Sequence, residues 1–473
     1  MKSAAAVAGA ALLPQALGAR SPRSRSARGG LDVAEEHGWD RVPSILARIR
    51  PPAIGRRAFP VTRYGAKADG VTDCTEAFRR AIGACASAGG GRVVVAGGTF
   101  LSGPIHLRSR VNLEVQEGAT IRFSTDPKAY EQYVLTRFEG VELMGLSPLI
   151  YASNATDVAI TGSGTLDGQS SQSVWWPWKG QTAHGWKRGT EHQGPARARL
   201  FEMAERNVPV ASRRFGVESY LRPPFIQPYG CTNVLIEGVT IRNSPMWEIN
   251  PVLCRNVIVR GVRIETHGPN NDGCDPESCR DVLIERCHFD TGDDCIAIKS
   301  GRNADGRRVN VPTENVVIRD CEMRDGHGGV TIGSEISGHV RHVYVERCRM
   351  DSPQLDRALR LKNNAMRGGT LEHIYMRDVE VGQLADAVLQ VDFLYEEGRN
   401  GSFPPVVRDV ELLRVTSRKS NYGLYLRGYD RGTIADVRVI DCTFDGVTKP
   451  DVLEHVTGLV RRNVTVNGAK VNG

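Results

Sequence analysis

Long apolar runs are scarce in this chain of 473 residues. Beyond the N-terminal leader no stretch is long and apolar enough to cross a membrane, so we expect no membrane partner. Aromatic residues make up only 6% of the chain, whereas glycine occurs 51 times. Few bulky side chains and many glycines favour tight turns over a helical bundle.

Cysteine lacks the spacing of a structural metal site. The eleven cysteines include no paired Cys-x-x-Cys arrangement, so we expect no zinc site, and we expect no other metal or cofactor. Their odd number leaves at least one outside any set of disulfides.

Positive charge is in modest excess. The formal net charge of +7 suits a polyanionic partner, either an acidic polysaccharide or a nucleic acid, and it equally suits a mildly basic surface with no specific partner. Charged residues at 24% and apolar residues at 40% allow a buried core.

The first 30 residues have the pattern of an export signal and linker. Lys2 precedes a short apolar run that ends in the small-residue pattern of residues 16–19, and a basic Ser/Arg/Gly-rich segment follows. A disordered alanine-rich leader is the alternative. Export would place the protein in the periplasm or outside the cell. Residues 31–57 form an N-terminal lead-in, and residues 58–473 form one domain.

An amphipathic helix is expected at about residues 72–87. Asp73 and Thr75 lie near its start, three glycines follow its end at positions 89–91, and a strand is expected at residues 92–96.

From Pro104 onward the pattern indicates strands only. Short β-branched runs recur, each opened by Asn, Asp or His and followed by an apolar residue, at Asp157, Asn233, Asn256, Asp281, Asn315, His342, His373, Asp409 and Asp436. From Asn233 the steps are 23 to 36 residues. The runs alternate instead of repeating every 3.6 residues, and each is too short to bury a face alone. These features predict an all-β fold, a right-handed parallel β-helix of about ten coils, with the early helix capping its N-terminal end.

The cysteines share the register of this repeat. Some lie two residues before a repeat marker and others six residues after one: Cys231, Cys254 and Cys279, and then Cys287, Cys321, Cys348 and Cys442. Equal offsets put them at equal places in successive coils, so we expect buried thiol ladders. Disulfides between rungs are the alternative, because the rung spacing is close to the Cα separation that they need.

Three acids are separated by about one coil. Asp272 lies 21 residues before Asp293, and Asp294 follows directly. Adjacent rungs would therefore bring them together, and Gly292 allows the turn that both consecutive acids need to reach one groove. Mutual repulsion would push their pKa values apart, as acid and base catalysis requires. Ordinary Asp-Gly turns are the alternative.

Further coils add cations at a similar step. His327 lies 33 residues after Asp294, and Arg360 lies 33 after His327. Arg360 and Lys362 are two residues apart, so they share one strand face.

These motifs resemble those of the family 28 glycoside hydrolases, the polygalacturonase family. The matches are Asn270-Asn271-Asp272, Asp293-Asp294, Gly326-His327-Gly328 and Arg360-Leu361-Lys362. The resemblance extends from about residue 59 to the C-terminus and is strongest to bacterial exo-acting members. One departure is Asn271, where the family usually has threonine.

The resemblance implies an inverting hydrolase of the α-1,4-galacturonosidic bonds of pectin. It makes Asp293 the general acid, has Asp272 and Asp294 activate water, and has His327 hold the acid. Arg360 and Lys362 would bind the substrate carboxylate, with Lys299 and Asn270 as further contacts. Inversion calls for carboxyls about 6.5–9.5 Å apart.

The mode of action depends on loops. One insertion, residues 169–221, contains four tryptophans that would either stack on sugars or anchor the loop, and another spans residues 301–308. We expect exo action by a monomer on an acidic polysaccharide, and no nucleic-acid partner. Endo action, and a rhamnogalacturonan or xylogalacturonan substrate, are alternatives. A pectate lyase and a non-catalytic carbohydrate-binding β-helix are remoter ones.

Overall fold

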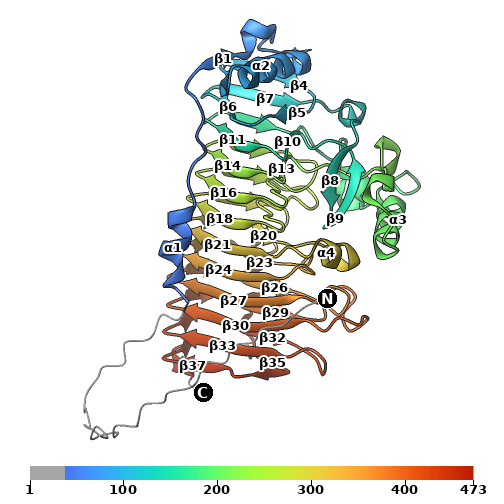
Figure 1. Cartoon of the computed structure of the whole chain (residues 1–473). Helices are drawn as coiled ribbons and strands as arrows, with labels where there is room; N and C mark the ends of the chain where they lie inside the picture. The colour runs from blue at the N-terminus through green and yellow to red at the C-terminus, as the bar shows by residue number, and fades with distance from the viewer. Residues whose placement is uncertain (1–37, 472–473) are drawn as a thin grey trace, which may run out of the picture. The chain divides into compact units, whose positions relative to one another are not determined.

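Short parallel strands, stacked rung upon rung, build the body of the molecule (Figure 1). The computed structural model describes residues 38–471, so the export signal and linker predicted in residues 1–30 lie outside the described residues. The predicted parallel β-helix is confirmed. No helix among residues 38–471 is both long and apolar enough to cross a membrane.

The first sheet of the β-helix has fourteen strands. They are β1 (Ala58–Pro60), β3 (Gly91–Val95), β6 (Val111–Val115), β11 (Thr156–Thr161), β14 (Thr232–Glu237), β16 (Arg255–Arg260), β18 (Arg280–Glu285), β21 (Thr313–Arg319), β24 (Val340–Glu346), β27 (Thr370–Arg377), β30 (Val406–Leu413), β33 (Ile434–Ile440), β36 (Val456–Thr457) and β37 (Val460–Arg462).

The second sheet also has fourteen strands. They are β2 (Asp69–Asp73), β4 (Gly98–Ser102), β7 (Ala119–Phe123), β12 (Thr165–Asp167), β15 (Thr240–Arg242), β17 (Arg263–Thr266), β19 (His288–Thr291), β22 (Glu322–Met323), β25 (Arg349–Met350), β28 (Glu380–Gln383), β31 (Thr416–Lys419), β34 (Thr443–Phe444), β38 (Thr465–Val466) and β39 (Ala469–Lys470).

The third sheet consists of two blocks. The upper block is β5 (Ile105–Leu107), β10 (Ile150–Ser153) and β13 (Ile226–Tyr229), and the lower block is β20 (Ile296–Ile298), β23 (Val330–Ile332), β26 (Arg357–Lys362), β29 (Ala387–Asp392), β32 (Tyr422–Arg427) and β35 (Val452–Glu454). Isolated bridges at Ile249 and Cys274 join the blocks, so regular pairing is interrupted between β13 and β20.

The repeat markers have a backbone role. All nine adopt a left-handed conformation, with φ near +60°, at the start of first-sheet strands. Asn, Asp and His tolerate this conformation better than other non-glycine residues do, which explains the marker composition. Neighbouring markers also bond to one another, as Asn256 Nδ2 does to Asn233 Oδ1 at 2.7 Å.

The first sheet stacks thirteen rungs, because β36 and β37 both pair with β33, which is somewhat more than the expected number of about ten coils. The rungs of β1, β3 and β6 have Arg56, Gly90 and Arg110 at the marker position, so the repeat pattern does not identify them. At the other end β36 and β37 add two short strands to the edge of β33.

Helix α2 (Thr75–Ser87) is the predicted cap. Asp73 accepts a bond from the Thr75 backbone N–H at 2.9 Å and so fixes the helix start. One face buries Phe78, Ala81 and Ile82 over the first rungs, which keeps the N-terminal edge of the core from solvent (Figure 1).

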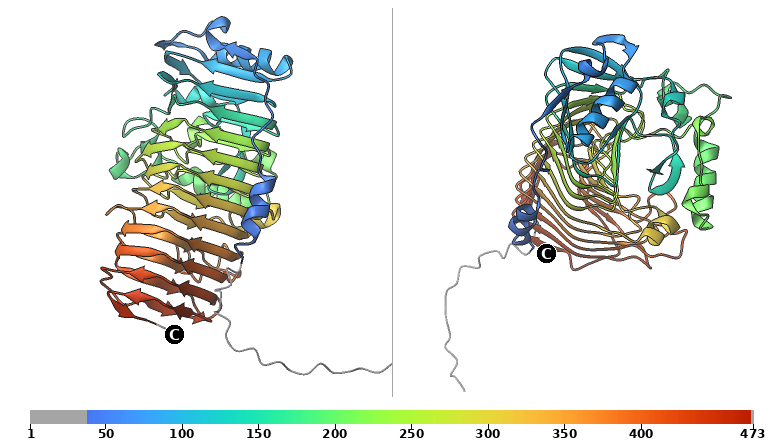
Figure 2. Two further views of the ribbon diagram at one scale, coloured as in Figure 1. Left: turned by 90° about the vertical axis from the view of Figure 1, so that its left-hand side faces the viewer. Right: turned by 45° about the horizontal axis from the view of Figure 1, so that its top comes forward.

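The lead-in contains a helix that the sequence did not predict, α1 (Arg41–Arg48). It lies along the outer face of the first sheet (Figures 1 and 2). That face carries an apolar stripe, which is covered by Val42 and Ile45 of α1 and by Trp39 just before the helix. The folded region therefore begins near Gly38, earlier than the expected start near Ala58. Periodicity missed α1 because eight residues give too few turns to detect.

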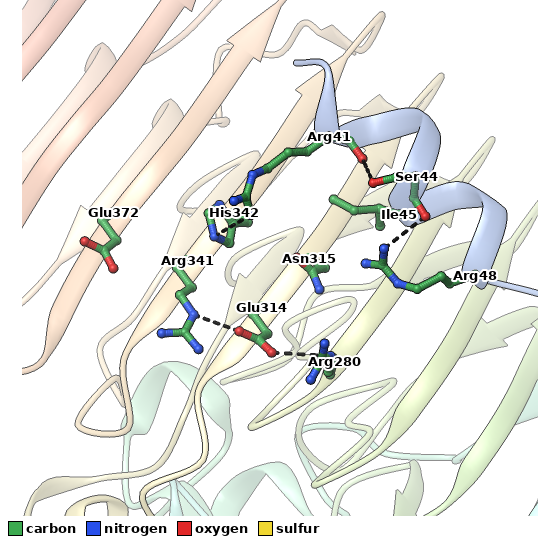
Figure 3. Close-up of a pocket in the computed structure, with 10 residues that line it drawn as sticks. All are labelled: Arg41, Ser44, Ile45, Arg48, Arg280, Glu314, Asn315, Arg341, His342 and Glu372. Atoms are coloured by element: carbon green, nitrogen blue, oxygen red, sulfur yellow. Dashed lines mark hydrogen bonds and ion pairs between the residues drawn. The ribbon is translucent and has the colours of Figure 1, made fainter. Parts of the chain in front are cut away.

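A groove of about 500 Å³ lies between α1 and the first sheet (Figure 3). Its cations already have partners: Arg341 bonds Glu314 at 2.7 Å, and Arg41 bonds the ring of His342 at 3.0 Å. The groove thus belongs to the contact that fastens α1 to the sheet.

A hairpin and two helices cover the upper part of the third sheet (Figures 1 and 2). They are β8 (Val134–Phe138) with β9 (Val141–Gly145), α3 (Gly194–Glu205) and α4 (Asn303–Val309). Buried Arg137 of the hairpin pairs with Glu277 at 3.0 Å, and Arg213 pairs with Asp305 of α4 at 2.8 Å. These ion pairs fix the added elements to the β-helix near the interrupted stretch of the third sheet.

All eleven cysteines, which lie within the described residues, are buried and free. Cys231, Cys254 and Cys279 occupy equivalent positions on successive rungs. The predicted thiol ladder is therefore present, and no disulfide joins its members.

Candidate active site

The predicted site residues lie where regular pairing of the third sheet is interrupted. Asp272, Asp293 and His327 occupy the connections that lead from the second sheet to the third. Cys274, Ile296 and Val330 stack in register on three successive rungs, so the acids and His327 also lie on successive rungs. Strand β26 supplies Arg360 and Lys362 one rung further on.

These residues surround a cavity of about 220 Å³. Its lining includes every predicted site residue except Asp294, which is fully buried beside it. The remaining lining residues are Glu139, Lys179, Arg197, Trp247, Ser334, Glu335, Tyr395 and Glu396.

The three acids are in close proximity. One carboxylate oxygen of each lies within 4.8 Å of one from both others. The nearest oxygens of the three acids are thus closer together than the two carboxyl groups of an inverting pair are expected to be, because the acids lie on adjacent rungs. The charge of this trio is offset by Lys299, Lys362 and Arg360.

Asp294 is held ionised. Lys362 Nζ lies 2.7 Å from its Oδ2, while Thr331 and Arg360 reach Oδ1 at 2.8 Å and 3.4 Å. Burial raises the pKa of Asp294, but the charges of Lys362 and Arg360 outweigh burial and hold it well below the ordinary value. Asp294 is therefore an acceptor fixed in place.

Asp293 is the most accessible acid, with 19% of its side chain exposed. Its Oδ1 accepts a bond from Nδ1 of His327 at 3.0 Å. Burial raises the pKa of Asp293, yet the His327 hydrogen bond brings it below the ordinary value, and the same bond raises the pKa of His327. The pair therefore holds a proton on the imidazole next to the carboxylate.

Asp272 has the opposite environment. Burial, with repulsion from Asp293 next, raises the pKa of Asp272 to about 8. Its Oδ1 has no hydrogen-bond partner among the described residues. Within the trio, the environment therefore favours the protonated form at Asp272 and the ionised form at Asp293.

Lys299 lies beneath Asp272. Its ammonium group is within 3.6 Å of three carboxylates, those of Asp272, Asp275 and Glu335. It also lies 4.5 Å from the centre of the Trp247 ring. The ammonium group of Lys299 is therefore already paired with carboxylates of the protein. Its predicted contact with substrate stays a prediction.

Asn270 is held by two cations. Its Oδ1 accepts bonds from Lys179 Nζ at 2.7 Å and from the Arg222 guanidinium at 2.8 Å. Asn271, where the family motif has threonine, is fully buried and accepts bonds from Thr266 and the Gly268 N–H. The departure from the motif is thus accommodated locally.

Sequence reasoning missed several lining residues because they come from added segments. Glu139 lies in the β8–β9 turn, and Lys179 and Arg197 belong to the 169–221 insertion. None of the four tryptophans of this insertion lines the cavity: Trp175, for instance, packs on Tyr130 and Trp178. They anchor the loop, and the tryptophan in the cavity wall is Trp247, which carried no sequence signal.

Interacting carboxyls in the cavity of a parallel β-helix are the kind of site that a glycosidase uses. The chain belongs to the glycosyl hydrolases of family 28, whose family model matches residues 216–457. A second model, described as rhamnogalacturonase A/epimerase, pectate lyase-like, matches residues 58–121.

Individual relatives agree with this assignment. An exopolygalacturonase of known structure from Thermotoga maritima is 45% identical, with a TM-score of 0.90, over 92% of this chain and 97% of that one. A Vitis vinifera protein described as "Probable polygalacturonase" is 30% identical, and an exo-poly-alpha-D-galacturonosidase from Dickeya chrysanthemi is 27% identical, each over 73% of this chain. The alignments span 65% and 58% of the length of these two relatives.

Proposed function

We propose that the protein hydrolyses the α-1,4-galacturonosidic bonds of polygalacturonate, releasing galacturonate from chain ends with inversion. The observation that carries this proposal is the carboxyl trio with His327 beside a cavity that Arg360 also lines. Family membership supports the reaction class, and the exo-acting relatives from Thermotoga maritima and Dickeya chrysanthemi support the substrate and the mode.

Asp293 is the proton donor in this proposal. It is the most exposed acid, whereas Asp294 is fixed by its three partners and Asp272 is 4% exposed. The pKa directions favour the proton on Asp272, so substrate binding must transfer this proton to Asp293, which leaves Asp272 ionised. Asp272 and Asp294 then act on the water, and the unpartnered Oδ1 of Asp272 is available to orient it.

Arg360 is suited to the substrate carboxylate. Arg360 lines the cavity, and Nη1 of its guanidinium lies 3.4 Å from Asp294 Oδ1. A planar guanidinium binds a carboxylate through paired N–H groups, which favours a uronate over a neutral sugar at this position. Lys362 contributes charge mainly through Asp294.

Exo action follows from the closed side of the cavity. Glu139 of the β8–β9 turn and Lys179 and Arg197 of the insertion line the cavity, and these added segments would limit how far a chain extends past the acids on that side. Endo action would require an open groove on both sides of the acids.

Product analysis on polygalacturonate over time tests the proposal. Galacturonate as the sole early product supports exo hydrolysis, whereas a ladder of oligomers would establish endo action. A product that absorbs at about 235 nm, and whose formation stops when EDTA is added, would establish a lyase instead. Proton NMR of the first product decides the stereochemistry: the β-anomer indicates inversion, and the α-anomer would match the short carboxyl separation of a retaining enzyme.

An exported location fits this substrate, because pectin lies outside the cell. We propose periplasmic or extracellular action as a monomer, without nucleic acid or a membrane as partner. Cell fractionation and light scattering on the purified protein test the two points.

A further inference from the structure

A second group of cations borders the cavity on the side away from Arg360. Lys179 donates to Asn270 Oδ1 at 2.7 Å, and Arg222 donates to the same oxygen at 2.8 Å. Two positive charges thus meet on one neutral amide oxygen.

Neither cation has an anionic partner within ion-pair distance among residues 38–471. Arg222 is 1% exposed, and its other acceptors are Gln193 Oε1 and the carbonyls of Pro245 and Pro269. Burial lowers the pKa of Arg222 to about 10 and lowers the pKa of Lys179 as well. The carboxylates of Glu139 and Asp293 favour both charges, but from beyond ion-pair distance, so burial outweighs them. A carboxylate bound at this point would stabilise both cations further.

The second pair of cations in the cavity wall differs because it has an anionic partner. Arg360 and Lys362 both contact Asp294, at 3.4 Å and 2.7 Å, so much of their charge is already neutralised. Asn270 and Arg360 are separated by the rungs of Cys274, Ile296, Val330 and Leu359. Three rung steps amount to about 14 Å, and the acids lie within this span.

Resting on the proposed function, we propose that Lys179, with Arg222 behind it, binds the carboxylate of the chain-end galacturonate. The two sugars joined by the cleaved bond then each present a carboxylate to its own cation group, one on either side of the acids. The enzyme would therefore require a free acid on the terminal sugar and reject a methyl ester there. Lys179 is the specificity residue because it is the member of the pair that lines the cavity.

The experiment compares two ligands, digalacturonate and its analogue methyl-esterified at the non-reducing end. We expect the wild-type protein to prefer the free acid by about 10- to 100-fold in kcat/KM, the range of a hydrogen bond to a charged group. Lys179→Met should lose most of this preference through KM, and Lys179→Arg should keep part of it. Lys187→Met is the matched control, because Lys187 is exposed in the same insertion, and it should behave as wild type.

Two outcomes overturn the inference. In one, Lys179→Met discriminates the two ligands as well as the wild-type protein does. In the other, Lys179→Met loses the same factor on both ligands, so that Lys179 only balances the charge of the acids. Failure of the wild-type protein to release galacturonate from polygalacturonate would overturn the proposed function instead. Calorimetric titration of the Asp293→Asn protein, with and without Lys179→Met, against the same two ligands then still decides whether Lys179 binds the carboxylate.

Discussion

His327 and Asp293 lie on adjacent rungs, and Nδ1 of the ring meets Oδ1 of the carboxyl at 3.0 Å. The bond lowers the pKa of Asp293 and raises that of His327, so each residue holds the other in its charged form. His327 thus holds the carboxyl of the proposed donor in place.

Replacing His327 with Gln should reduce kcat on polygalacturonate on the order of 100-fold, the lower range for general acid catalysis. The positive charge beside Asp293 is lost, while an amide keeps a hydrogen bond to Asp293. A p-nitrophenyl galacturonide needs little protonation of its leaving group, so Asp293→Asn should retain most activity on it, and Asp272→Asn should not. The reverse pattern would make Asp272 the proton donor.

The pH profile should show a descending limb near pH 8. The trio keeps one proton up to the raised pKa of Asp272, about 8, and above it no proton is left for the leaving group. We therefore expect kcat/KM to fall as pH rises through about 8, and Asp272→Asn to change this limb. Activity that rises through pH 8 would contradict the shared-proton account.

Stability should depend on Asp272 with a defined sign. Its folded pKa lies above the unfolded value near 4, so the folded state binds more protons between about pH 4 and 8 and loses stability as pH rises through that window. Asp272→Asn should therefore raise the melting temperature at pH 8 by a few degrees more than at pH 4. Equal effects at both pH values in thermal scans would show that Asp272 is not protonated.

Lys362 should matter through Asp294. Removing a buried partner at 2.7 Å leaves the Asp294 charge less compensated, so Lys362→Met should raise the pKa of Asp294 and lower kcat/KM at least about 100-fold. The control is Lys419→Met, because Lys419 is exposed on the second sheet. Unchanged kinetics in Lys362→Met would show that Asp294 takes no part in the reaction.

Helix α1 should stabilise the fold without entering the chemistry. Trp39 is 3% exposed and its ring lies 5.4 Å from that of Tyr344. Trp39→Ala should cost about 3–5 kcal/mol of unfolding free energy, measured by denaturant titration, with kcat per folded molecule unchanged. Val71→Ala, at an exposed site, serves as the control. A loss of kcat without a loss of stability would link α1 to the site.

The sequence by itself determined the fold class and the order in which the site residues lie on successive rungs. The markers from Asp157 to Asp436 repeat because each coil needs one residue in the left-handed conformation, and a repeat of backbone requirements is visible in one dimension. The same step placed Asp272 one rung from Asp293 and Asp294, and it placed His327, and then Arg360 with Lys362, on the next rungs.

Only the tertiary structure decided how the cavity is closed and where its charges balance. Lys179, Glu139 and Arg197 reach the acids from an insertion and a hairpin, whose paths depend on long-range packing and ion pairs such as Arg137–Glu277. Burial and the positions of neighbouring charges set the pKa of Asp272 above that of Asp293, and neither quantity is written in the spacing of residues. A solenoid repeats locally, so its sequence predicts its rungs, whereas the elements laid over the rungs are fixed by contacts between segments far apart in the chain.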